Sequence, residues 1–177
     1  MNVTHNSDLV YDAAAVRRLL AIPTLKCPKC VDGCLTFYDP GWSIVELQRT
    51  FDVRAKGSSH WHVEEPFARL ADSPRYRHLR MTAVADSFGK TFGEQSVLLL
   101  DNEEVPSARV VFMGMVIHFL ATGERLFHDH CVRCRDRVMD RHLRVYLGYF
   151  DSDGFLVDGI SDYDRHDYLG LASARML

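Results

Sequence analysis

The stretch LRVYLGYFDSDGFLVDGI, residues 143–160, decides the fold class of this chain. It contains two apolar runs, 143–150 and 155–160, separated by the polar sequence Asp151-Ser152-Asp153-Gly154. Apolar runs of this length around a short turn that contains Gly are typical of a β-hairpin. The sequence therefore predicts two antiparallel strands joined at this turn.

A second hairpin is predicted nearer the N-terminus. The runs 35–38 and 43–53 flank the sequence Asp39-Pro40-Gly41-Trp42, in which Pro followed by Gly suits the central positions of a type II turn. The second run places four apolar residues on one alternating face: Val45, Leu47, Phe51 and Val53. We expect the two runs to pair as strands.

Other segments show the apolar spacing of helices. The predicted helices are residues 9–22, which end before Pro23, and residues 63–71, 106–120 and 133–142. Short strands are predicted at 97–100 and 125–127. Helices and hairpins together predict an α+β fold, with residues 1–177 forming a single domain.

The composition supports one globular domain and excludes two other classes of protein. Of the 177 residues, 47% are hydrophobic and 25% are charged, and the formal net charge is −3. This apolar content excludes an intrinsically disordered chain, and the charge argues against a protein that coats nucleic acid by bulk charge. The apolar stretch 110–121 is interrupted by His118 and is too short to span a membrane. Because the N-terminus also lacks a secretory signal, we expect a cytoplasmic protein without membrane contact.

The cysteines form two pairs of the CxxC type. Cys27 and Cys30 make the first pair, and Cys131 and Cys134 make the second. Two residues between cysteines allow both thiolates to face one tetrahedral ion, so the sequence predicts one structural zinc held by all four. Two separate sites completed by histidines, or no metal at all, are the alternatives. Cys34 is left over, and we expect it to be a small buried residue.

The surroundings of the pairs resemble those of zinc ribbon and treble-clef proteins. The first pair lies in the knuckle-like sequence Cys27-Pro28-Lys29-Cys30-Val31-Asp32-Gly33, and the second enters the predicted helix 133–142. The resemblance implies a fold closed by zinc, in which segments 25–35 and 128–143 flank an inserted core, residues 36–127. It implies no activity.

A second resemblance points to an enzyme. His62-Val63-Glu64 followed by Cys131-Val132-Arg133-Cys134 is similar to the motifs of zinc-dependent nucleoside and cytidine deaminases. This resemblance implies that His62, Cys131 and Cys134 hold a catalytic zinc and that Glu64 transfers protons. Deamination of a nucleobase or nucleoside is therefore an alternative function.

Arginines suggest where a partner binds. Five of them lie on or next to the predicted helix 133–142: Arg133, Arg135, Arg137, Arg141 and Arg144. A second basic stretch contains Arg69, Arg75, Arg77 and Arg80. Because guanidinium groups make bidentate contacts with phosphate and carboxylate, we expect this helix to contact nucleic acid or a protein partner.

Three functions follow from these observations. The favoured one is a zinc-stabilised binding or regulatory protein, not an enzyme, that uses the Arg-rich helix. The deaminase is the second, and a structural subunit of a larger assembly is the third. The sequence does not predict the oligomeric state.

Overall fold

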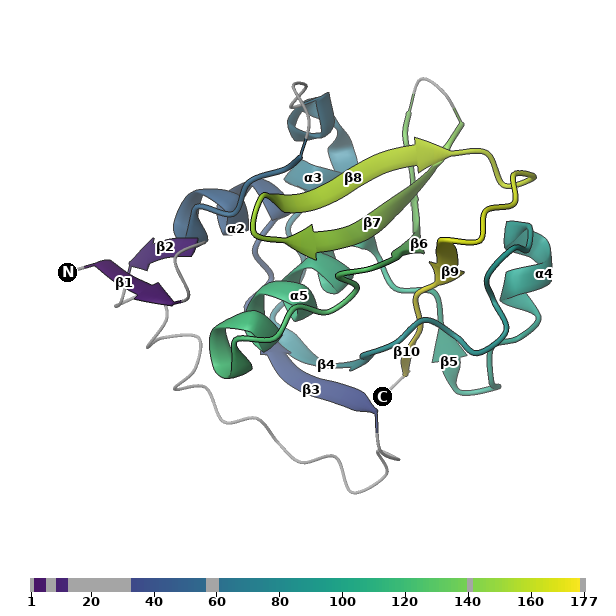
Figure 1. The fold of residues 1–177 in the computed structure, drawn as a ribbon, viewed down its shortest axis with the longest axis horizontal. Coiled ribbons are helices and arrows are strands. Elements are labelled where there is room, and N and C mark those ends of the chain that lie inside the picture. The colour runs from purple at the N-terminus through teal and green to yellow at the C-terminus, as the bar shows by residue number, and fades with distance from the viewer. Residues whose placement is uncertain (1, 6–8, 13–32, 57–60, 140–141, 176–177) are drawn as a thin grey trace.

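The computed structural model describes residues 2–5, 9–12, 33–56, 61–139 and 142–175, with side chains from residue 33 onward. The chain has an α+β fold (Figure 1), as the sequence predicts. Its elements are β1 (Asn2–His5), β2 (Leu9–Asp12), β3 (Cys34–Asp39), α2 (Ile44–Phe51), the 3-10 helix η1 (Trp61–Glu64), α3 (Pro66–Arg69), β4 (Arg75–Arg80), α4 (Phe92–Ser96), β5 (Glu103–Glu104), α5 (Ala108–Thr122), β6 (Cys131–Arg137), β7 (Arg144–Asp151), β8 (Gly154–Ile160), β9 (Leu169–Leu171) and β10 (Ala174–Arg175).

Two four-stranded sheets are built from strands distant in sequence. The first has the order β3-β4-β10-β5, and the second has the order β8-β7-β6-β9. In the second sheet, β6 is parallel to β9 and antiparallel to β7. β1 and β2 pair as a separate antiparallel hairpin.

Helix α5 lies between the two sheets (Figure 1) and contacts strands of both. Every residue from Ala108 to Leu120 is buried, as expected for a helix that is apolar on all sides. Gly114 allows close contact with β4, because an added Cβ would lie 2.4 Å from Leu79 Cδ2. The main core around this helix includes residues from Phe37 to Ala172.

The predicted hairpin at residues 143–160 is confirmed. Strands β7 and β8 pair antiparallel, with Arg144 opposite Ile160 and Asp151 opposite Gly154 at the turn. The predicted helix 106–120 is also confirmed as α5, which begins after the N-cap Ser107 and ends at Gly123. Both segments have long apolar runs with clear end signals.

The second predicted hairpin is wrong, although its first strand exists as β3. Residues 44–51 form helix α2, because Ser43 and Glu46 make a capping box. Ile44, Leu47 and Phe51, spaced three and four apart, are the buried face of this helix. Strand β3 pairs instead with β4, with Cys34 opposite Arg80 and Asp39 opposite Arg75.

The predicted helix 133–142 is also wrong. Residues 131–137 form strand β6, between β7 and β9 in the second sheet. Cross-strand pairing in this sheet outweighs the helical spacing of its apolar residues. The expected Arg-rich helix therefore does not exist.

The remaining short segments agree with the sequence only in part. Residues 9–12, predicted as helix, form strand β2, and the rest of the predicted helix 9–22 lies outside the described residues. The predicted helix 63–71 is divided into η1 and α3. Residues 97–100 and 125–127, predicted as strands, contain no strand. No helix in the described ranges is both long and apolar enough to cross a membrane.

Candidate anion-binding site

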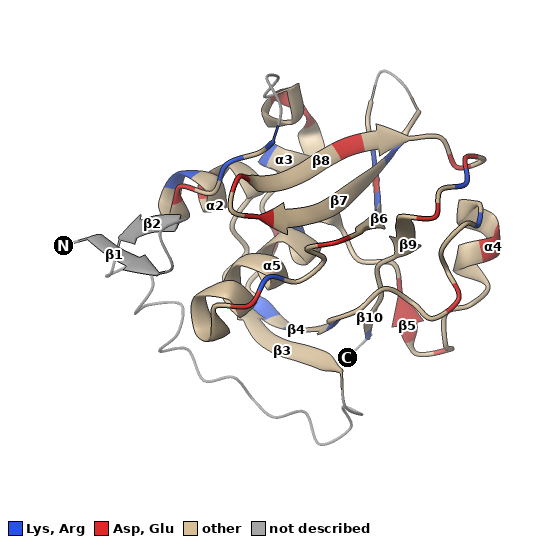
Figure 2. Cartoon of the chain, viewed as in Figure 1, with Lys and Arg blue, Asp and Glu red and all other residues tan. Residues whose placement is uncertain are grey.

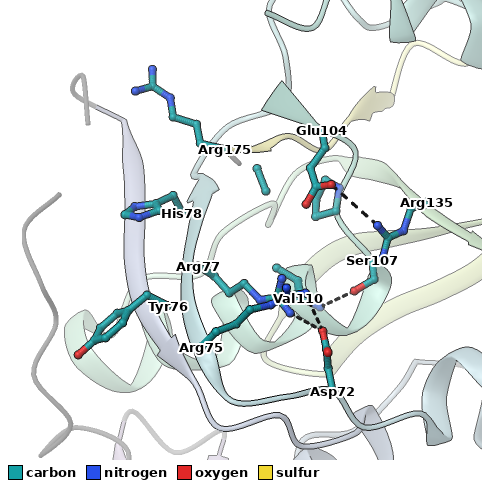
Figure 3. A pocket seen from close by; sticks show the side chains of 12 residues that line it. Asp72, Arg75, Tyr76, Arg77, His78, Glu104, Ser107, Val110, Arg135 and Arg175 are labelled. Atoms are coloured by element: carbon teal, nitrogen blue, oxygen red, sulfur yellow. Dashed lines mark hydrogen bonds and ion pairs between the residues drawn. The ribbon is translucent and has the colours of Figure 1, made fainter. Parts of the chain in front are cut away.

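A pocket lies where the first sheet meets the N-terminal end of α5 (Figure 3), with a volume of about 280 Å³. In the described part of the chain, β10 pairs with β4 at His78 and Leu79 only, so the pocket lies beside the earlier part of β4. The described residues that line it are Asp72, Arg75, Tyr76, Arg77, His78, Glu104, Pro106, Ser107, Val110, Arg135, Ala174 and Arg175.

The pocket carries positive charge. Its lining contains four arginines and two carboxylates, an excess of two positive charges. Figure 2 shows the acidic strand β5 in red near this region, and Glu104 of β5 lies 3.9 Å from Arg135 of β6. The N-terminus of α5, where Ser107 accepts a hydrogen bond from the Val110 N–H, adds the positive end of the helix dipole. The electrostatics therefore favour an anionic ligand.

Asp39 fixes two arginines behind the pocket. Its buried carboxylate accepts hydrogen bonds from Arg109 Nη1 and Nη2 at 2.8 and 2.7 Å and from Arg77 Nε at 3.1 Å. The Gly41 N–H donates a further bond at 2.8 Å. Burial alone would raise the pKa of Asp39, but these donors, Arg109 foremost, lower it below the ordinary value. Both guanidinium planes are thus held by a charged group that stays ionised.

Asp72 lies on the pocket side of the same arginines. Its Oδ2 accepts hydrogen bonds from Arg75 Nη2 at 3.0 Å, from Arg109 Nη2 at 3.2 Å and from Arg77 Nη2. Figure 3 shows Arg75 and Arg77 reaching toward Asp72, whereas Tyr76 and His78 point the other way. Burial again raises the pKa of Asp72, but the Ser73 N–H and the arginines outweigh it and lower this pKa to about 2.

Two of the arginines predicted to bind a partner are structural. Arg133 is fully buried and donates to Lys90 O at 2.9 Å, Gln95 Oε1 at 2.8 Å and Asp164 O at 2.7 Å. Arg144 is also buried; its Nε donates to Asp162 Oδ1 at 2.6 Å. Neither guanidinium group is accessible to a partner.

The other three predicted arginines differ in position. Arg135 lines the pocket with 63% of its side chain exposed. Arg137, two residues further along β6, is 48% exposed and forms an ion pair with Asp162. Arg141 lies outside the described residues. Sequence reasoning thus found one member of the site on β6, and Arg75 and Arg77 through the second basic stretch.

Asp39, Arg109 and Ser107 were missed as parts of a site. Asp39 was read as a turn residue, and Arg109 lies in an apolar helix. The one available signal was the charge of Arg109 itself, since an arginine in a buried helix needs a partner.

The second cysteine pair does not converge on one point. Cys134 packs in the main core with Val132, whereas Cys131 packs with Tyr146 and Leu169 in a smaller cluster. Alternation along β6 explains this, because residues three apart in a strand face opposite sides of the sheet. Burial raises the pKa of Cys131 to about 12 and that of Cys134 well above its ordinary value. Burial therefore favours the neutral thiol form of both groups when no ion is bound.

The first pair, Cys27 and Cys30, lies outside the described residues. Within the described ranges, no group of three or more His, Cys, Asp or Glu side chains could hold a metal ion. Cys34 is half-buried on β3 as a free thiol. The predicted four-cysteine zinc site stays a prediction.

The residues of the deaminase motif are separated. His62 is fully buried, with Nε2 3.0 Å from Gln48 Oε1, and its ring packs edge-on against Phe155. Glu64 is exposed and forms an ion pair with Arg69. His62, Cys131 and Cys134 are all described, and the structure does not assemble them into a metal-binding group.

Comparisons with protein-family models, curated proteins and solved structures find no match for this chain.

Proposed function

We propose that the protein binds nucleic acid, with a phosphate-bearing part of the strand entering the pocket between β4 and α5. The observation that carries this proposal is the lining of one pocket by four arginines against two carboxylates. Arginine is the side chain best suited to bind phosphate oxygens, because its planar guanidinium group presents paired donors.

The arginines are arranged in advance of binding. Asp39, itself held by Arg109, accepts a hydrogen bond from Arg77 Nε, so the lining residue Arg77 loses little conformational entropy when a ligand arrives. The helix N-terminus at Ser107 adds positive potential at the same place. The fixed guanidinium group and the positive potential at the helix N-terminus together favour binding of a compact phosphate group over a diffuse acidic surface.

The size of the pocket suits one nucleotide unit. Its volume of about 280 Å³ lies near the lower end of small-molecule sites, so it admits a phosphate and its sugar but no folded partner. The net charge of −3 restricts binding to this local region, because the whole protein does not attract a polyanion.

Binding should depend on the pocket arginines and on salt. We expect the double variant Arg75→Gln plus Arg135→Gln to bind a labelled single-stranded oligonucleotide about tenfold or more weakly than the wild type, because two charged hydrogen bonds are lost. The dependence of log affinity on log salt concentration should become shallower by about 1.4, or about 0.7 for each lost phosphate contact. Fluorescence anisotropy at several salt concentrations measures both quantities.

Arg137→Gln is the matched control, since Arg137 lies on the same strand as Arg135 but does not line the pocket. Its affinity should stay within about twofold of the wild type. Wild-type binding that is absent or independent of salt would contradict the proposal, as would equal losses in the control and the double variant.

The zinc site has a separate test. A single ion held by Cys27, Cys30, Cys131 and Cys134 predicts zinc at one equivalent per chain, lost from Cys27→Ser and equally from Cys131→Ser. Cys34→Ser, the control, should keep the metal. Elemental analysis of the purified proteins measures this. Zinc lost from Cys27→Ser alone would place the ion at the first pair, and wild-type protein without zinc would end the prediction.

A further inference from the structure

Asp72 occupies a position that suits a ligand. Three guanidinium groups, from Arg75, Arg77 and Arg109, donate to the same atom, Asp72 Oδ2. An oxygen that receives three arginine donors is the arrangement that proteins use to hold an anion. Here the anion belongs to the protein itself.

The two aspartates that bind these arginines have different surroundings. Asp39 is fully buried and bonded through both oxygens to the arginines and to Gly41 N, so its removal would leave buried charge unpaired. The side chain of Asp72 is 38% exposed, and residues 70–74 around it are all exposed. The backbone at Asp72 is anchored separately, because its N–H donates to Gly41 O at 2.9 Å. The Asp72 side chain can therefore rotate toward water while the loop stays in place.

The charge of the incoming group decides whether such an exchange is favourable. A phosphodiester inside a strand carries one negative charge, so its exchange for the Asp72 carboxylate leaves the charge balance at the arginines unchanged. A terminal phosphomonoester carries about −1.5 to −2 charges at neutral pH and three acceptor oxygens. Only the monoester adds negative charge at the arginines, and its three acceptor oxygens equal the three arginines in number.

We propose that Asp72 is an internal substitute for a phosphate, and that the arginines Arg75, Arg77 and Arg109 exchange it for the terminal phosphomonoester of a nucleic acid strand. This inference rests on the proposed function and adds a preference for strand ends over internal positions. The preference comes from the extra charge and oxygens of the monoester, whereas Asp72 competes with every phosphate and weakens the binding of all strands by the same factor.

The test uses oligonucleotides of one sequence that end in a 5′-phosphate, a 3′-phosphate or hydroxyl groups only. We expect the wild type to bind at least one phosphorylated end about tenfold more tightly than the hydroxyl ends, because a doubly charged group gains charged hydrogen bonds. The two phosphorylated forms distinguish the polarity of the strand. Removal of the internal competitor in Asp72→Asn should tighten binding of all three oligonucleotides by about the same factor and leave the preference unchanged.

Asp101→Asn is the matched control: Asp101 is exposed, and no ion pair or side-chain hydrogen bond is seen for it in the described structure. It removes the same charge from the chain and should leave the affinity for all three oligonucleotides within about twofold of the wild type. If Asp72→Asn folds poorly in thermal denaturation, Arg75→Gln replaces it, and the preference for a phosphorylated end should then fall.

The outcomes separate the two proposals. Salt-dependent binding that requires Arg75 and Arg135 but ignores the terminal phosphate would overturn the Asp72 exchange and leave the proposed function standing. An Asp72→Asn affinity equal to that of Asp101→Asn would also overturn it. If neither the wild type nor Asp72→Asn binds any of the oligonucleotides, both proposals are refuted.

Discussion

Replacement of Asp39 by alanine should lower the free energy of unfolding by about 3–5 kcal/mol, because removing one partner of a buried ion pair leaves the other charge unpaired. Arg109 is buried with Asp39 and donates both Nη atoms to it at 2.8 and 2.7 Å. Arg77 Nε donates to the same carboxylate at 3.1 Å. Urea denaturation followed by circular dichroism measures the loss.

Asp72→Asn is the comparison for Asp39→Ala, since Asp72 binds the same arginines from the solvent side. Loss of the Asp72 charge should lower the free energy of unfolding by about 1 kcal/mol or less, as for exposed ion pairs. A smaller loss for Asp39→Ala than for Asp72→Asn would contradict the assignment of Asp39 as the structural anchor. The pKa of Asp39 lies below its ordinary value of 3.8, so its stabilisation is present at neutral pH and is lost as the pH falls through the folded-state pKa.

Arg133→Met should have the next largest effect on stability. The guanidinium of Arg133 joins strand β6 to Gln95 of α4 and to the segment around Asp164. Methionine keeps much of the volume but leaves the buried Gln95 Oε1 without its donor, at about 1–3 kcal/mol, and removes two further charged hydrogen bonds, to Lys90 O and Asp164 O. We expect a total loss of about 3 kcal/mol or more, measured by thermal denaturation.

Hydrogen exchange gives a local measure of the same substitution. Amides near Asp164 should exchange faster in Arg133→Met than in the wild type, because the guanidinium of Arg133 donates to Asp164 O. Arg137→Met, on the same strand but 48% exposed, should change stability by about 0.5 kcal/mol or less. Equal effects of the two substitutions would mean that burial of Arg133 contributes nothing specific.

Local sequence was sufficient to predict the elements whose boundaries carry clear sequence signals. Helix α5 has Ser107 and Gly123 at its boundaries and an apolar run between them, and the β7–β8 hairpin has the short turn 151–154. Residues 44–51 were misread because alternation and helical spacing both fit so short a run; the Ser43–Glu46 capping box was the signal that decided it. Strand β6 depends on pairing with β7 and β9, which local sequence does not contain.

The candidate site was predicted less well than the fold, for a related reason. Arg135 was identified as part of a basic cluster, but the helix proposed to carry it does not exist. Arg109 and Asp39 are 70 residues apart in sequence, so their pairing arises only when α5 packs against the first sheet. A cluster assembled from distant elements in this way leaves no local pattern to read.

The position of the pocket has a mechanical consequence. Arg77 belongs to the first sheet and Arg135 to the second, and both face the same space at the end of the helix between them. A ligand held by both would bridge the two layers as a non-covalent crosslink. Binding of a ligand in the pocket and the stability of the contact between the two sheets are therefore linked. A bound strand would make separation of the sheets less favourable.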